Sequence, residues 1–174
     1  LPDADLHCAD LKRADLHEAD LEGADLHGAD LNRANLERAE LRWADLHGAD
    51  LKRANLCGAD LKDADLHRAD LRGADLRDAN MKGARMKGVR LESADLEQAS
   101  LAGNLVGADF SDGRLARADL SGANLKDARF LNADLRQANF TACNLYAADF
   151  TGARLGKATF RRANLRDAVF TGAD

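Results

Sequence analysis

Proline is almost absent from this 174-residue chain, which has a single one, Pro2, beside its first residue. Proline lacks a backbone N–H and is avoided where that group joins a β-ladder, so its scarcity leaves the whole chain free for ladder hydrogen bonding. Aromatic residues are also scarce, at 5%, although 45% of the residues are apolar. We therefore expect a narrow core of leucine and alanine without large rings.

Cysteine is too rare to form a disulfide framework, because the chain has only three. Cys8 and Cys57 are expected at outward turns, whereas Cys143 stands at an alanine position and is expected to be a small buried apolar residue. No signal peptide or apolar run of transmembrane length is recognisable, so we expect no membrane partner.

The chain is dominated by a five-residue pattern. Leu, Met or Phe returns every fifth residue from Leu1 to Leu101 and, after a slip of one position, from Leu105 to Phe170, usually with Ala two places before it. Five residues turn a helix by about 500°, so no apolar stripe forms, and a long strand fails because five is odd. A short Ala-x-Leu strand followed by a two-residue turn predicts a solenoid with Ala and Leu inside.

Longer echoes indicate four pentapeptides in each coil. Residues 25–36 and 45–56 differ at a single position. A 15-residue coil would misalign these echoes, and a 10-residue coil, which fits some of them, leaves little room for a leucine core. Phenylalanines also recur at 20, with two members halfway between: Phe110, Phe130, Phe150 and Phe170, then Phe140 and Phe160.

The pattern resembles the pentapeptide-repeat family, whose signature is A(D/N)LXX, over essentially all 174 residues. The resemblance implies an all-β fold, a right-handed quadrilateral parallel β-helix. We expect 1–174 to form one such solenoid. A one-residue phase break near 101–105, either a bulge or a tightened turn, separates a Leu-centred part (1–101) from a Leu/Phe-centred part (105–174). The six phenylalanines are expected to form two core stacks on opposing sides.

The pattern is already running at Leu1 and stops within a unit at Ala173-Asp174. We therefore expect the natural protein to extend beyond this stretch. A cytoplasmic location is favoured, with a leader outside the stretch as the alternative.

No enzymatic function is expected, because a filled rod without insertions offers no concave, water-poor pocket. The sequence also shows no phosphate loop, Ser-His-Asp arrangement or Cys-His zinc spacing, and no cofactor is expected. The interpretation we favour is a structural or protein-interaction solenoid with an unknown protein partner. The alternative, implied by the family resemblance, is a DNA mimic that binds DNA gyrase or topoisomerase, as in quinolone resistance.

Charge is distributed unevenly along the chain, whose net charge is −5. Residues 1–30 hold nine acidic and two basic residues, a net −7, which favours the mimic. Residues 31–101 are neutral and 102–174 carry a net +2, which count against it. A solvated surface that keeps a repeat protein in solution is the simpler interpretation.

Two sets of polar residues are candidate sites. Four histidines spaced by 20 residues are expected to stack beside carboxylates, as a solvated ladder or as a candidate metal site: His7, His27, His47 and His67. A basic stripe is interpreted as self-neutralised by interleaved aspartates, so no direct nucleic-acid binding is expected: Lys12, Arg13, Arg33, Lys52, Arg53 and Arg72.

Three further features are candidates for contacts with other proteins. Four cations without an intervening acid form a belt: Lys82, Arg85, Lys87 and Arg90. Trp43 falls at an outward turn of an otherwise polar rod, which suggests a contact site. The Phe-rich C-terminal coil is a candidate homodimer end, with Phe160, Leu165 and Phe170 near the junction.

Overall fold

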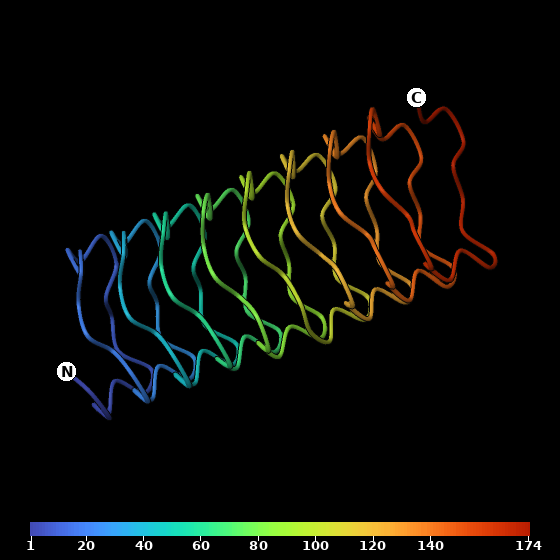
Figure 1. The fold of residues 1–174 in the computed structure, drawn as a ribbon. Helices are drawn as coiled ribbons and strands as arrows, with labels where there is room; N and C mark the ends of the chain where they lie inside the picture. The colour runs from blue at the N-terminus through green and yellow to red at the C-terminus, as the bar shows by residue number, and fades with distance from the viewer.

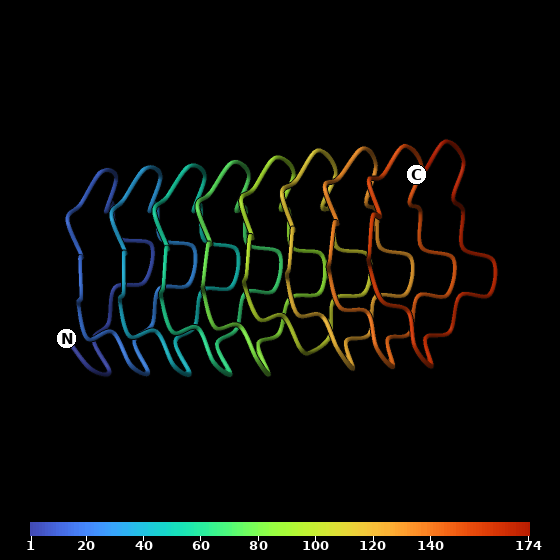
Figure 2. The same cartoon turned by 45° about the horizontal axis from the view of Figure 1, so that its top comes forward.

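A computed structural model describes residues 1–174 as a straight rod of stacked, roughly square coils (Figure 1), with the two termini at opposite ends. The fold is a right-handed quadrilateral parallel β-helix. It contains no helix and no extended strand. Instead, single parallel bridges link each coil to the next, as in Asp5 with Asp25 and Asp25 with Asp45. A turned view shows the same outline repeating from coil to coil (Figure 2).

Each coil has four faces, which we number from the coil 41–60. Leu41 lies at the centre of face 1, Leu46 of face 2, Leu51 of face 3 and Leu56 of face 4. The two residues after each central residue form the corner that leads to the next face. The corner after face 1, for example, consists of Arg42 and Trp43.

The backbone hydrogen bonds explain why the unit is five residues long. In the unit 24–28, four N–H groups donate to backbone carbonyls: Ala24 to Leu21, Asp25 to Ala4, Leu26 to Asp45 and Gly28 to His47. The fifth, on His27, donates to Oδ1 of Asp25 at 2.9 Å. An Asp or Asn before the central residue therefore satisfies the one donor that the ladder leaves over.

The corners require an unusual backbone conformation. The second corner residue has φ between 53° and 76° in every unit except at the phase break. With the hydrogen bond from Ala to Leu across the corner, this is the pattern of a type II turn. Glycine was expected at such positions, but Arg, Asp and even Trp43 adopt the left-handed conformation. The ladder on both sides of each corner offsets the cost of about 1–2 kcal/mol per residue.

The interior is a continuous column of apolar side chains. Fifty-two buried residues form one cluster, and no polar or charged residue is buried. Four phenylalanine rings stack along face 3 at 4.8–4.9 Å between centroids: Phe110, Phe130, Phe150 and Phe170. Phe140 and Phe160 stack on face 1 and meet the first set edge-to-face. The two opposing stacks agree with the spacing of the sequence.

The phase break is a shortened corner. Bridges across it join residues 19 apart, as in Arg85 with Asn104, and return to 20 from Asn104 onward. Gly103 takes the inward alanine position and its carbonyl accepts from Asn124 N–H. A Cβ on Gly103 would lie 2.7 Å from the carbonyl oxygen of Ala84. The absent side chain thus lets the shorter coil close against its neighbour.

Candidate interaction surfaces

Trp43 lies at the corner between faces 1 and 2, and 58% of it is exposed. It is the only strongly exposed large apolar residue away from the terminal coils; the others are Leu1, Val169 and Phe170. Trp43 forms one wall of a surface notch of about 500 Å³, which we call the Trp43 notch. The notch is lined by Trp43, Asp45, Asp63, Asp65, Gly83 and Arg85.

The Trp43 notch brings together two candidates that the sequence treats separately, Trp43 and Arg85. Arg85 Nη1 lies 3.6 Å from Oδ2 of Asp65. Asp63 has no hydrogen-bond or ion-pair partner, and its side chain lies over the space that Gly83 leaves empty. An exposed indole thus stands beside carboxylates, one of which is free to pair with an incoming cation.

The other three members of the belt lie on the same two neighbouring coils but around the rod. Arg90 on face 3 pairs with Asp70 and Glu92, each at 3.5 Å. Lys82 and Lys87 are exposed corner residues, and neither has a carboxylate within 4.0 Å. The belt is therefore partly neutralised, and its free charges are the two lysines.

The four histidines do stack in one column. Ring centroids of His7, His27, His47 and His67 are 4.9–5.2 Å apart. The aspartates that precede them accept hydrogen bonds from the backbone N–H groups of the same histidines. No group of three or more His, Cys, Asp or Glu side chains is arranged to hold a metal ion. Metal binding by this column stays an untested hypothesis.

The basic stripe is only half neutralised, which corrects the interpretation from the sequence. Its first-corner residues pair with aspartates: Lys12 with Asp30 at 3.0 Å, Lys52 with Asp50 at 2.7 Å and Arg72 with Asp70 at 2.6 Å. The second-corner residues have no carboxylate within 4.0 Å: Arg13, Arg33 and Arg53. The physical reason is direction, because the first corner residue stands next to the aspartate that caps it, whereas the second points away.

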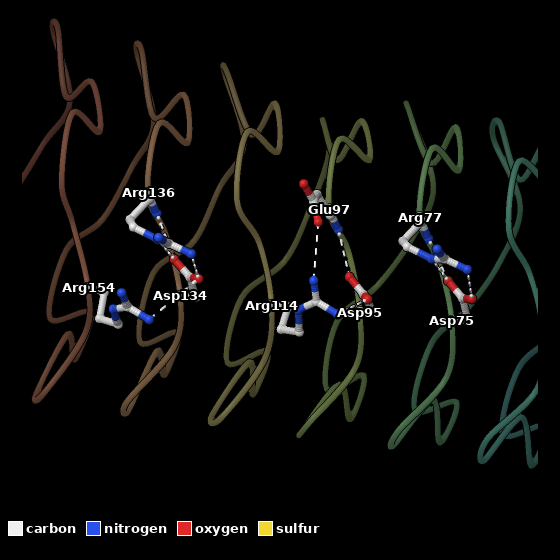
Figure 3. A network of polar contacts seen from close by, with 8 residues as sticks. All are labelled: Asp75, Arg77, Asp95, Glu97, Arg114, Asp134, Arg136 and Arg154. Carbon is white, nitrogen blue, oxygen red and sulfur yellow. Dashed lines mark hydrogen bonds and ion pairs between the residues drawn. The ribbon is translucent and has the colours of Figure 1, made fainter.

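Ion pairs on face 4 follow the same rule (Figure 3). Arg77 and Arg136 each form two bonds to the aspartate two residues before them, Asp75 and Asp134. These hydrogen bonds lower the pKa of both carboxyl groups. Arg114, which itself occupies a face position, instead reaches Asp95 on the preceding coil at 2.8 Å.

The residues predicted at a homodimer end lie on the last coil. Phe160 and Leu165 are partly buried against the core. Phe170 stacks on Phe150 and is 38% exposed, and the neighbouring Val169 is 43% exposed. The last coil therefore presents an apolar surface.

Family profiles match most of the chain. The profile described as pentapeptide repeats matches residues 4–42, 39–78 and 64–103, and the one described as pentapeptide repeat region matches 101–170. The chain belongs to the pentapeptide repeat family. No curated protein sequence matches it significantly.

Several solved structures are similar to this chain. HetL, a pentapeptide repeat protein involved in heterocyst differentiation regulation in the cyanobacterium Nostoc sp. strain PCC 7120, is 30% identical over 99% of this chain and 87% of its own, with a TM-score of 0.44. A pentapeptide repeat protein from the Arabidopsis thaliana thylakoid lumen is 36% identical over 60% and 70%, with a TM-score of 0.46. Full-length QnrB1, a plasmid-mediated fluoroquinolone resistance protein, is 21% identical over 98% and 89%, with a TM-score of 0.60, and shares the fold. The chain has no helix that is long and apolar enough to cross a membrane.

Proposed function

We propose that this protein is a non-enzymatic interaction solenoid whose surface binds another protein. The interior is filled by apolar side chains, and every charged group lies on the outside. The coils hold these groups in columns about 4.8 Å apart along the rod. Such a surface is suited to present fixed side chains to a partner rather than to enclose a substrate.

The observation that carries this proposal is the exposed Trp43 in its acidic notch. Tryptophan is enriched at the energetic centres of protein interfaces, and an exposed one on a polar rod lowers the desolvation cost of a contact. The free carboxylate of Asp63 favours a partner that presents a basic side chain beside an apolar one.

Affinity capture from the native source tests the proposal with Trp43→Gly. Glycine suits the positive φ of Trp43, so this variant is expected to stay folded. Gln98→Gly, at the same position of a unit on face 4, is the matched control. We expect a protein that wild type and control retain and Trp43→Gly loses. Identical captured proteins in all three would contradict the assignment of this surface.

The alternative function, a DNA mimic that binds gyrase, is favoured by the net −7 of residues 1–30. Part of that charge is neutralised within the rod, because Asp30 pairs with Lys12, Glu22 with Arg42 and Glu18 with Arg38. A gyrase supercoiling assay with titrated protein separates the two functions. The interaction solenoid predicts unchanged supercoiling, and inhibition at stoichiometric protein would favour the mimic.

We also propose that the chain forms a homodimer through its last coil. Val169 and Phe170 supply exposed apolar surface there, and the net +2 of residues 102–174 causes less repulsion than pairing of the acidic ends would. The acidic coils then point away from the junction.

A further inference from the structure

A second notch lies at the corner between faces 3 and 4, diagonally opposite Trp43. It has a volume of about 360 Å³, and we call it the arginine notch. Its walls carry four cations and one amide, with no carboxylate and no apolar side chain: Asn32, Arg33, Lys52, Arg53 and Arg72. A concave surface with only donors along its walls is complementary to an anion.

The positive charge in the arginine notch is uneven. Lys52 and Arg72 are already paired with Asp50 and Asp70. Arg33 and Arg53 are exposed and have no acidic partner. The two paired cations thus form the sides of the notch, and the two free guanidinium groups supply its net charge.

The backbone places these two arginines on successive coils. Arg33 N–H donates to the carbonyl of Lys52, and Arg53 N–H donates to that of Arg72. Their Cα atoms are therefore about one coil spacing apart, roughly 4.8 Å. Beyond Arg53 the same column continues with Gly73, whose missing side chain leaves room, since its Cβ position would lie only 3.6 Å from Cγ of Arg53.

We propose that the arginine notch binds a single phosphate group, free or as a phosphomonoester on a protein segment. Two guanidinium forks on neighbouring coils match the several oxygens of a tetrahedral dianion, and Arg–phosphate bonds are charge-assisted and often bidentate. The site suits one group rather than a nucleic-acid backbone. Asp30, Asp50 and Asp70 flank it along face 3 and repel a continuous row of phosphates.

The test uses the whole chain labelled with ¹⁵N, titrated with inorganic phosphate, with a phosphoserine peptide and with the same peptide unphosphorylated. We expect saturable amide shifts at residues 32–33, 52–53 and 72–73 with phosphate and with the phosphopeptide. Arg33→Ser/Arg53→Ser is expected to weaken binding about tenfold or more. Arg68→Ser/Arg117→Ser removes the same charge from two other corners with positive φ and is expected to bind as wild type.

The outcomes separate the source of the phosphate from the existence of the site. Tighter binding of the phosphopeptide than of inorganic phosphate supports a phosphorylated partner, and equal binding supports a free phosphate. Equal loss in the two double variants would show nonspecific charge attraction and overturn the proposal. So would equal shifts with the unphosphorylated peptide, or no saturation. Because Trp43 lies at the opposite corner, capture by the Trp43 notch succeeds or fails separately.

Discussion

Leu51 and Lys52 are neighbours in the chain but lie on opposite sides of the coil wall. Leu51 is fully buried, whereas Lys52 lies at the corner beside solvent. Leu51→Ala is expected to leave a cavity and to lower the free energy of unfolding by about 2–5 kcal/mol. Ala49→Leu is expected to overpack the same layer and cost about 1–3 kcal/mol. Urea unfolding measures both, and Lys52→Ala, expected near zero, is the control. A loss for Lys52→Ala as large as that for Leu51→Ala would invert the assigned inside and outside.

Cys143 differs from the other two cysteines in its access to reagents. Its thiol is buried at an alanine position and donates to the carbonyl of Leu120 at 2.9 Å. Burial raises its pKa to about 11, so only about one thiol in a thousand is ionised at pH 8. Iodoacetamide at pH 8 is expected to label exposed Cys8 in the folded chain and Cys143 only in urea. Mass spectrometry reads the labelling, and equal rates at Cys8 and Cys143 in the folded chain would contradict this burial.

At the scale of the five-residue unit, the conserved spacing of aspartate has a backbone cause. Asp25 accepts from His27 N–H, and no ladder carbonyl is available to that donor. Asp25→Ala is expected to lower the free energy of unfolding by about 0.5–1.5 kcal/mol. Asp25→Asn keeps an oxygen acceptor and is expected to be nearly neutral. If urea unfolding shows the two variants equally destabilised, charge rather than this hydrogen bond is responsible.

The shortened corner at Gly103 gives a second prediction at this scale. A Cβ there would lie 2.7 Å from backbone oxygen, which has little freedom to move, and the φ of Gly103 is 153°. Gly103→Ala is expected to cost about 1–3 kcal/mol of unfolding free energy. Gly156→Ala is the control, because its Cβ would meet only the side chain of Arg136 at 3.7 Å. Equal midpoints for both variants in urea would mean that the coil shifts to admit the methyl group.

The sequence predicts the coils and their inward residues well, because Ala-x-Leu alternation is a local property and the 20-residue echoes define the coil. It predicts the ion pairs poorly, because they depend on side-chain direction. Arg72 pairs with an aspartate two residues away, whereas Arg114 pairs across coils. The Trp43 notch also depends on Gly83, two coils further along, which leaves space that no local pattern indicates.

At the scale of the whole molecule, the two ends of the rod differ in charge and in apolar exposure. Residues 1–30 carry a net −7, and the last coil exposes Val169 and Phe170. A two-fold pair through the last coil buries those side chains and closes, whereas head-to-tail stacking joins acidic to basic ends and runs on without closure. The two arrangements differ in their response to salt, because screening weakens charge attraction but not apolar contact.

Light scattering on Phe170→Asp tests the two-fold pair. We expect wild type to run as a dimer and Phe170→Asp as a monomer, because a carboxylate at the junction is desolvated without a partner. Thr171→Asp adds the same charge at the neighbouring exposed corner and is expected to stay dimeric. A monomeric wild type at high concentration would rule out the pair. Oligomers that dissociate on added salt would instead indicate head-to-tail stacking, since only that arrangement depends on attraction between the acidic and basic ends.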